Sequence, residues 1–344
     1  MATMLDVAKL AGVSVKTVSR VINNEPHVQD ALRVRVKTAA KNLGYVPSAS
    51  ARSLRSRRSY QVHLINHATT GTYIHCIQAG ALQVCQDGGY QLLVSVMSDH
   101  RGDLAEAFKR RFERQLERAK PDGVILVPPF ADVDGISRWL TNQDIAVARI
   151  GVNTIDNCVV SVLIDEFKAA QDLTSLLVER GHKRIAFIRG SEDQSATEER
   201  FRGYASVLED AGIQFDPDLV IEGDFHFPTG LAAGLRLFEM TDRPTAVFAA
   251  NDDMAAGVIV AGHKLGLVAP RDFSVVGFDD ADIAEMTWPA LTTVRQPVLD
   301  FGTVATLDLI RSFEEGDGSR VSTRRVLDYE LVLRDSVGPP PSTR

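Results

Sequence analysis

The sequence predicts a mixed α/β protein, with a small all-α helix-turn-helix head followed by two doubly wound parallel-sheet subdomains. A chain of 344 residues has room for about two domains. The first sixty residues carry only helical patterns, whereas the rest alternates short apolar runs with helical stretches. With 44% hydrophobic and 24% charged residues, the composition excludes a disordered, fibrous or membrane-embedded chain.

The formal charge divides the chain at the same place. Residues 1–60 contain eleven Lys or Arg and three acids, a balance of +8, and the remaining residues have a balance of −15. A basic head on an acidic body indicates that the head binds a polyanion, of which nucleic acid is the foremost candidate. From charge alone, a solvated basic face is an equal alternative.

The first helix of the head begins with a capping box. Thr3 supplies the N-cap hydroxyl and Asp6 the carboxylate three residues later, so a helix is expected from there to about Ala11. Three apolar residues are expected on its buried side: Leu5, Ala8 and Leu10.

The second helix follows a tight turn at Gly12. Ser14 caps a helix expected from Val15 to about Asn23, in which Val18 and Val21 face back toward the first helix. This layout predicts a helix-turn-helix whose second helix presents its N-terminal residues to the major groove. A third helix is expected over about 30–43, with four apolar residues at helical spacing: Leu32, Val36, Ala39 and Leu43.

Two long motifs in this basic segment carry a family resemblance. The string DVAKLAGVSVKTVSRVINN, followed by LGYVPSASARSLRSRRS, resembles the head and hinge of the LacI/GalR family of bacterial transcription repressors. The resemblance implies a sequence-specific regulator, a repressor of carbohydrate-utilisation genes, which binds a double-stranded, pseudo-palindromic operator as a homodimer. The head residues expected at DNA are Ser14, Val15, Lys16, Thr17, Ser19, Arg20 and Asn23.

The resemblance gives these residues different roles. Val15 and Lys16 occupy positions that vary with operator sequence, and their chemistry fits, because a valine methyl contacts thymine and a lysine donates to the O6 and N7 atoms of guanine. Arg20 is also expected to approach base edges. The hydroxyls of the head are interpreted as phosphate contacts or caps.

The sequence pattern of residues 48–57 predicts a short hinge helix. Helices this short are marginal in water, so it is expected to fold on DNA. The resemblance implies that two hinge helices of a dimer enter the minor groove, where Leu54 acts as an apolar wedge. The hinge residues expected at DNA are Ala51, Arg52, Leu54 and Arg55. The alternatives are packing of Leu54 against its own domain and ordinary linker charge for the arginines.

Beyond residue 60, nine apolar runs are expected as strands: QVHLIN, YQLLVSVM, DGVILVPP, DIAVARIG, VVSVLID, KRIAFIRG, DLVIEG, TAVFAAN and FSVVGFDD. Helical patterns between them predict βαβ units, and nine units exceed one sheet. The resemblance implies a periplasmic-binding-protein-like body of two subdomains, with crossings near residues 162, 292 and 324. The expected domains are a head (1–46), a hinge and linker (47–59), an effector-binding and dimerisation domain (60–338) and a tail (339–344).

An effector site is expected at the carboxyl ends of the strands, between the subdomains. The resemblance places Arg200, Phe225, Asn251 and Asp279 there, and Tyr73 lies near the expected aromatic position in HATTGTYIHC, a segment that departs from the family pattern. A guanidinium, a carboxylate, an amide and aromatic faces suit the hydroxyls and the C–H face of a sugar.

Alternatives remain for these residues. Arg200 is also compatible with a surface pair to Glu198 or Glu199, and Phe225 with core packing. Two further acids are interpreted as a helix cap and a loop acid: Asp252 and Asp280.

Other classes of protein fit less well. No P-loop, zinc-protease or nucleophile-elbow motif is present, so no enzyme activity, cofactor or metal is predicted.

Three cysteines without C-x-x-C spacing predict buried thiols. Without a signal peptide or membrane span, a solute-binding transport protein is disfavoured, and a cytoplasmic, nucleoid-associated protein with no membrane partner is expected. An activator and a purine-type corepressor-dependent repressor stay open as alternatives. The sequence has no leucine heptad after its last strand, so a dimer is expected and a tetramer is not.

Overall fold

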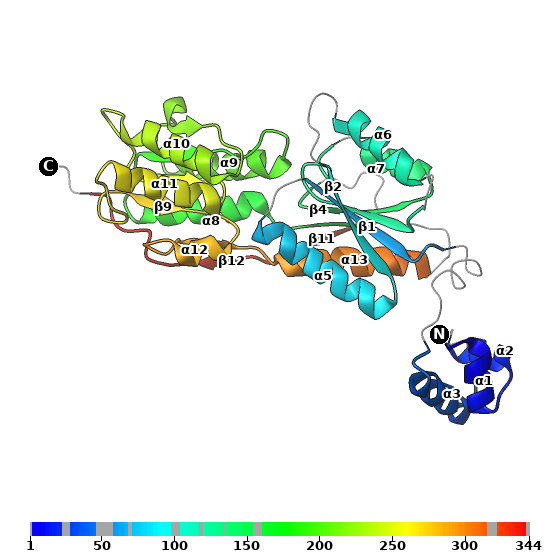
Figure 1. The fold of residues 1–344 in the computed structure, drawn as a ribbon. Coiled ribbons are helices and arrows are strands. Elements are labelled where there is room, and N and C mark those ends of the chain that lie inside the picture. Colours follow the sequence, from blue (N-terminus) through cyan, green and yellow to red (C-terminus); the bar gives the residue numbers. More distant parts are fainter. Residues whose placement is uncertain are drawn as a thin grey trace. The chain divides into compact units, whose positions relative to one another are not determined.

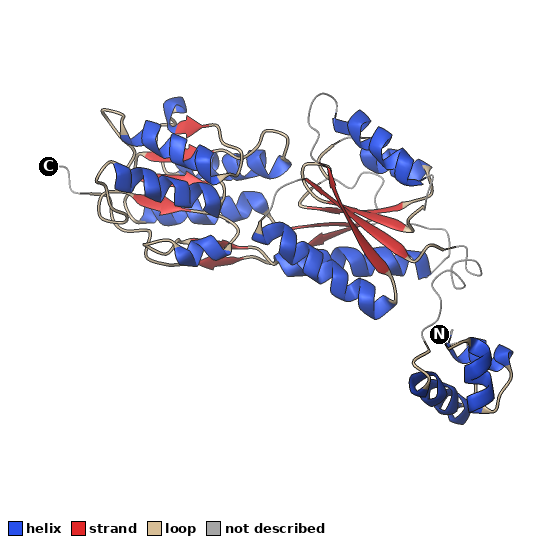
Figure 2. Cartoon of the chain, in the orientation of Figure 1, coloured by secondary structure: helices blue, strands red, loops and turns tan. Residues whose placement is uncertain are grey.

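The computed structural model describes residues 2–22, 28–45, 58–67, 71–97, 104–116, 120–133, 135–153, 160–314 and 322–341. The chain forms two compact units, Met1–Tyr60 and Gln61–Arg344. The first unit is all helical and the second is α/β (Figure 1, Figure 2). The predicted fold class and all nine predicted strands are confirmed.

The described part of the first unit contains three helices: α1 (Met4–Ala11), α2 (Val15–Ile22) and α3 (Asp30–Asn42). The predicted capping box is present, since the Thr3 amide donates to Asp6 Oδ2 at 2.9 Å and the Asp6 amide donates to Thr3 Oγ1 at 3.3 Å. Gly12 ends α1 with a φ of 60°. Val18 and Val21 are buried, as expected.

The buried face of α1 differs from the prediction. Leu5 and Leu10 are 52% and 55% exposed, and the residues that α1 buries are Val7, Ala8 and Ala11. At about 100° per residue, the leucines lie roughly 110° to either side of this stripe. Small side chains let the three helices approach closely, so position on the helix outweighs the greater hydrophobicity of leucine.

The third helix ends one residue earlier than expected. Leu43 is therefore its C-cap and is exposed, while Val36 and Ala39 are buried and Leu32 is half-buried.

The second unit begins with a six-stranded parallel sheet in the order β11-β5-β4-β3-β1-β2. Its strands are β1 (Gln61–His67), β2 (Gln91–Met97), β3 (Gly123–Leu126), β4 (Ala146–Ile150), β5 (Val160–Leu163) and β11 (Thr323–Val326). Helices α5 (Thr72–Gly88) and α13 (Val298–Glu314) cover one face, and α6 (Leu104–Leu116) and α7 (Ile136–Asn142) cover the other (Figure 1). We call this part the first lobe.

The second lobe contains a four-stranded parallel sheet in the order β7-β6-β8-β9. Its strands are β6 (Ile185–Ile188), β7 (Val220–Ile221), β8 (Ala246–Ala249) and β9 (Ser274–Val276). Its helices are α8 (Glu166–Glu179), α9 (Ser195–Asp210), the 3-10 turn η1 (Pro217–Leu219), α10 (Phe227–Phe238), α11 (Asp252–Lys264) and α12 (Asp282–Met286). An antiparallel ribbon of β10 (Thr293–Arg295) and β12 (Glu330–Val332) was not predicted.

The chain passes between the lobes three times, after β5, after β10 and after β11. Its final residues return to the second lobe, where the buried His182 contacts Ser274 Oγ and the Gly338 carbonyl, both at 3.0 Å. The predicted domain limits stay predictions, because the proposed hinge lies mostly outside the described residues. Cys85 is buried and Cys76 is half-buried. No helix in the described part of the chain is long and apolar enough to cross a membrane.

Candidate functional site

The exposed face of α2 is the first candidate surface. Val15, Lys16 and Arg20 are exposed, while Val18 and Val21 fix the opposite face of the helix against α1 and α3. The first turn of α2 contains no acidic residue, so the partial positive charge of the helix N-terminus is not neutralised there. The surface therefore suits a negatively charged partner.

Two of the predicted hydroxyls hold the turn before α2. The Thr17 amide donates to Ser14 Oγ at 3.1 Å, and the Ser14 and Thr17 hydroxyls are 2.9 Å apart. Ser19 is half-buried. The other residues predicted at DNA lie outside the described part of the chain: Asn23, Ala51, Arg52, Leu54 and Arg55.

The five residues predicted to bind effector line one pocket between the two lobes: Tyr73, Arg200, Phe225, Asn251 and Asp279. Tyr73 lies in the first turn of α5, after β1, and the other four follow β6, β7, β8 and β9. The pocket is thus formed at the carboxyl ends of strands from both sheets, where parallel sheets bind ligands. Its volume is about 160 Å³.

Arg200 is the central charge of this pocket and is only 4% exposed. Its Nε donates to Glu166 Oε2 at 2.8 Å and its Nη1 donates to the Ala250 carbonyl at 2.5 Å. Its Nη2 lies 3.8 Å from Asp279 Oδ1. A buried guanidinium flanked by two carboxylates is fixed in position before any ligand arrives.

The alternative in which Arg200 pairs with Glu198 or Glu199 at the surface is wrong. Glu198 instead pairs with Arg189 at 2.7 Å, and Glu199 pairs with Arg202 at 2.9 Å. The actual partner, Glu166, was missed by the sequence reasoning. Its place just after β5, at the carboxyl end of a predicted strand, was the signal that pointed to it.

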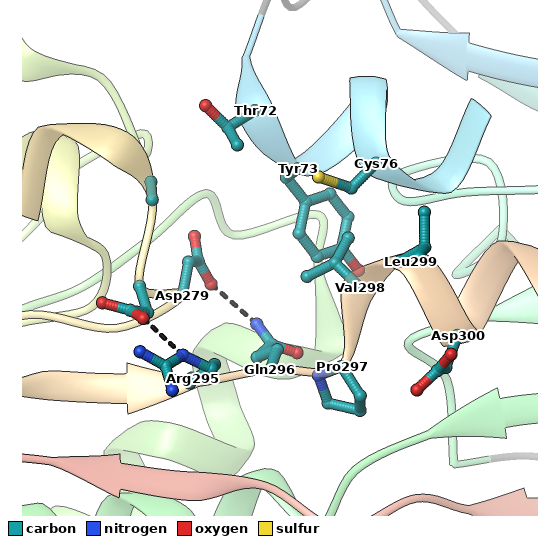
Figure 3. A pocket seen from close by; sticks show the side chains of 12 residues that line it. Thr72, Tyr73, Cys76, Asp279, Arg295, Gln296, Pro297, Val298, Leu299 and Asp300 are labelled. Atoms are coloured by element: carbon teal, nitrogen blue, oxygen red, sulfur yellow. Dashed lines mark hydrogen bonds and ion pairs between the residues drawn. The ribbon is translucent and has the colours of Figure 1, made fainter. Parts of the chain in front are cut away.

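Asp279 combines burial with charge. Burial raises the pKa of its carboxyl group to about 7, against the opposing effects of Arg200 and of a hydrogen bond from Gln296 Nε2 at 2.6 Å. Figure 3 shows the Gln296 amide reaching the Asp279 carboxylate across the wall of a second cavity. Asp279 is thus poised to gain or lose a proton near neutral pH.

The two neighbouring acids have structural roles and do not line this pocket. Asp280 is a loop acid, as predicted, but the predicted helix cap at Asp252 is wrong, because Asn251 caps α11. Asp252 is buried in the first turn of α11 and accepts hydrogen bonds from Thr293 Oγ1 at 2.7 Å and from the Ala281 amide at 2.8 Å. Burial, reinforced by Asp279, raises the pKa of Asp252 well above its ordinary value. Asp280 forms ion pairs with Arg295 at 2.6 Å and Arg334 at 2.7 Å.

Phe225 and Asn251 act together. The Asn251 side chain caps α11 by accepting from the Met254 amide at 3.0 Å, and its Nδ2 donates to the Phe225 carbonyl at 2.9 Å. Phe225 is half-buried and adopts a positive φ of 66°. A side chain at Gly190 would place its Cβ within 1.9 Å of the phenyl ring, so glycine is required there. Asn251 therefore holds the aromatic wall in place.

Tyr73 brings the first lobe into the same site. Burial raises the pKa of its hydroxyl far above the usual value, and the carboxylates of Glu166 and Asp279 act in the same direction. The phenol therefore stays neutral and is able to donate a hydrogen bond.

A second cavity of about 290 Å³ adjoins this pocket and shares Tyr73 and Asp279 with it (Figure 3). It is lined by α5, the loop after β9, and the passage from β10 into α13. One more contact joins the lobes, a hydrogen bond of 3.1 Å from the Ser195 amide to Asp132 Oδ1.

Comparisons with known proteins match both parts of the chain. Residues 3–48 match the model of bacterial regulatory proteins of the lacI family, and residues 174–337 match a periplasmic binding protein-like domain. The HTH-type transcriptional repressor PurR of Vibrio atlanticus is 33% identical over 341 residues, covering 98% of this chain and 99% of that protein. The ribose operon repressor of Escherichia coli K12 is 35% identical over 310 residues, covering 89% of this chain and 91% of that one.

Solved structures of similar fold are also bacterial transcription regulators. The transcriptional regulator CelR–cellobiose complex has a TM-score of 0.73 and 31% identity, covering 98% of this chain and all of that one. The lac repressor dimer bound to operator and the anti-inducer ONPF has a TM-score of 0.79 and 26% identity, covering 98% and 99%. These matches define a bacterial regulatory protein with a periplasmic-binding-protein-like body. The chain belongs to the LacI family.

Proposed function

We propose that this protein is a transcriptional repressor of carbohydrate-utilisation genes, whose operator affinity is controlled by a sugar bound between its two lobes. The observation that carries the proposal is the pocket in which side chains from both sheets converge on the buried Arg200. Because both lobes line this pocket, a ligand there has contacts that depend on how the lobes close. A regulator requires such coupling between ligand binding and the arrangement of the lobes.

At the DNA end, α2 lies in the major groove. Lys16 donates to guanine and Val15 contacts a thymine methyl, since both side chains are exposed at the first turn of the helix. Arg20 reaches a neighbouring base edge. The hinge residues, with Leu54 as the wedge, bind the minor groove between two heads.

At the effector end, the pocket offers an aromatic face, amide and guanidinium donors, and several carboxylate acceptors. Sugars present hydroxyls in directions that such groups bind in pairs, and their C–H faces pack on aromatic rings. A relative of known structure was solved with cellobiose. Relatives named as the repressor PurR and the ribose operon repressor favour repression over the alternative of an activator. A purine-type corepressor is the alternative to a sugar.

The working form is a homodimer in the cytoplasm. A relative of known structure is a dimer bound to operator. In this chain Met286 and Trp288 are 79% and 83% exposed, at the end of α12 and in the loop after it. Two large apolar side chains this exposed and two residues apart are candidates for the dimer surface. Sedimentation equilibrium of the full chain gives its mass, and a monomer at micromolar concentration would contradict the dimer.

The test is selection of bound sites from a random double-stranded DNA library, followed by titration of the recovered site. We expect a pseudo-palindromic consensus. Replacing Lys16 with alanine is expected to cost about 1 to 3 kcal/mol of binding free energy and to relax preference at one base pair in each half-site. The control is Lys264→Ala, an exposed lysine on the body.

An unchanged consensus for the Lys16 variant would reduce this residue to a phosphate contact. Failure to recover any consensus from the wild-type chain would reject the proposed function.

A further inference from the structure

The effector pocket is unusually acidic for a site whose central group is an arginine. Four carboxylates line it: Glu166, Asp224, Asp253 and Asp279. Among the described lining residues, Arg200 is the only lysine or arginine, and His226 is the only histidine. The four acidic residues outnumber Arg200 and His226 together.

The positive charge of Arg200 is already committed. Glu166 accepts from it at 2.8 Å and Asp279 lies 3.8 Å away, so two carboxylates flank one guanidinium. Its planar face lies 3.6 Å from the ring centroid of Phe278. An anionic ligand would have to compete with both carboxylates for the guanidinium, and displacing either would leave a buried charge unpaired.

The adjoining cavity offers no alternative cation (Figure 3). It adds Asp280 and Asp300 to the shared Asp279, and Arg295 is its only described lysine or arginine. Arg295 donates to Asp280 at 2.6 Å and to Glu330 at 2.8 Å. Both cavities therefore combine surplus carboxylates with arginines that acids already hold.

The remaining polar groups of the pocket favour a ligand rich in donors. Asp253 accepts no hydrogen bond from any residue in the described part of the second unit, and burial raises the pKa of its carboxyl group. Carboxylate oxygens accept hydrogen bonds from hydroxyls, and a phosphate or carboxylate ligand supplies no such donor when ionised. The Phe225 ring provides the apolar wall against which a C–H face packs.

We propose that the pocket selects an uncharged, polyhydroxylated effector and excludes phosphorylated and carboxylated sugars. This inference rests on the proposed function and narrows its effector to free sugars and other neutral polyols. A phosphate group within ~8 Å of the surplus carboxylates is expected to weaken binding ~100-fold relative to the neutral parent compound.

The first experiment measures thermal unfolding of the full chain with matched pairs at equal concentration. The pairs are D-ribose and ribose 5-phosphate, D-glucose and glucose 6-phosphate, D-fructose and fructose 6-phosphate, and cytidine and cytidine monophosphate, with cellobiose, inorganic phosphate and hypoxanthine added singly. At least one neutral polyol is expected to raise the unfolding temperature, because a ligand that binds only the folded state stabilises it. Its phosphorylated partner and inorganic phosphate are expected to leave the temperature unchanged.

Calorimetric titration then compares the dissociation constants of the responding pair in two variants. Asp253→Asn removes one unpaired carboxylate and is expected to reduce the preference for the neutral compound about tenfold. Asp218→Asn removes an exposed acid outside both cavities and is expected to leave that preference unchanged.

Three results would overturn the inference: a phosphorylated sugar that binds as tightly as its neutral parent, stabilisation by hypoxanthine but by no polyol, and no response to any polyol. An Asp253 variant with the wild-type preference would overturn its electrostatic basis. The DNA selection above is independent of these titrations, so a chain that recovers an operator but fails here keeps its role as a regulator and loses this effector class.

Discussion

Helix α2 of the head and the pocket between the lobes place their charged groups in opposite ways. On α2, Lys16 and Arg20 are exposed on a helix that a small apolar core fixes from behind. In the pocket, Arg200, Glu166 and Asp279 are held against one another with little exposure. The head therefore exposes its charged side chains on a surface, whereas the pocket pairs its charged side chains with one another.

The difference fits the partners proposed for the two surfaces. DNA brings many phosphates and releases counterions, so exposed cations gain free energy on contact. A small ligand in a closed pocket removes water from every group that it touches, so each charge there requires a partner beforehand. The charges of the head are therefore suited to attracting DNA phosphates, and those of the pocket are suited to orienting a small ligand.

Arg200→Ala tests the paired arrangement most severely. Removing one partner of a buried ion pair leaves Glu166 uncompensated and is expected to lower the free energy of unfolding by about 3 to 5 kcal/mol and to abolish effector binding. Urea unfolding and effector calorimetry measure these two losses. The matched control, Arg202→Ala, removes an exposed arginine two residues away on α9 and is expected to change both by little.

Operator affinity of the Arg200 variant, measured without effector, is expected to stay near the wild-type value if the effector is an inducer. An Arg200 variant with normal effector affinity would remove this residue from the site.

The pH dependence of stability gives a sharper test of the same arrangement. Burial raises the pKa of Asp279 to about 7 from the ordinary aspartate value of 3.8, so the folded protein binds more protons than the unfolded chain between about pH 4 and 7. Stability from this group is therefore fully present below about pH 4 and is lost as the pH rises to about 7. Asp279→Asn is expected to flatten this part of the profile of urea midpoint against pH.

The control for this profile is Asp218→Asn, which replaces an exposed acid of the same lobe. Equal slopes for wild type and the Asp279 variant between pH 4 and 7 would show that Asp279 is ionised in the folded protein throughout this range.

Leu54→Ala tests whether the DNA-binding surface proposed for the head continues into the hinge segment, residues 48–57. The variant loses the proposed wedge and is expected to bind operator about tenfold more weakly, with unchanged effector affinity in the absence of DNA. Titrations at fixed salt keep the phosphate contribution constant. The control is Leu10→Ala, because Leu10 is exposed on α1. Unchanged operator affinity in the Leu54 variant would mean that residues 48–57 are a passive linker.

The sequence predicted features with a local pattern. The capping box at Thr3 and the nine apolar runs became helix and strands because neighbouring residues determine them. Leu5 and Leu10 were assigned to the wrong face, because hydrophobicity alone does not report which stripe of a short helix meets its neighbours. The β10–β12 ribbon was missed because strands of three residues have almost no periodicity.

Only part of the pocket was predicted, because some of its contacts join residues far apart in the sequence. Five of its side chains were identified from family motifs, and the structure brings all five together. Glu166 and Gln296 were missed, although each bonds one of those five. Glu166 lies at the carboxyl end of a predicted strand, but it is 34 residues from Arg200 along the chain, so no local pattern paired the two. Gln296 follows β10, a strand that was not predicted.

The interleaved path of the chain through the two lobes has a consequence for synthesis. The first lobe receives α13 and its edge strand β11 only after the four-stranded sheet of the second lobe has been made. At about 5 to 20 residues per second, the ribosome needs roughly 7 to 27 seconds between the end of β5 and the start of α13. During that interval the face of the first sheet that α13 covers is open to solvent, whereas the head already has all of its core residues. The head is therefore expected to fold well before the body that regulates it.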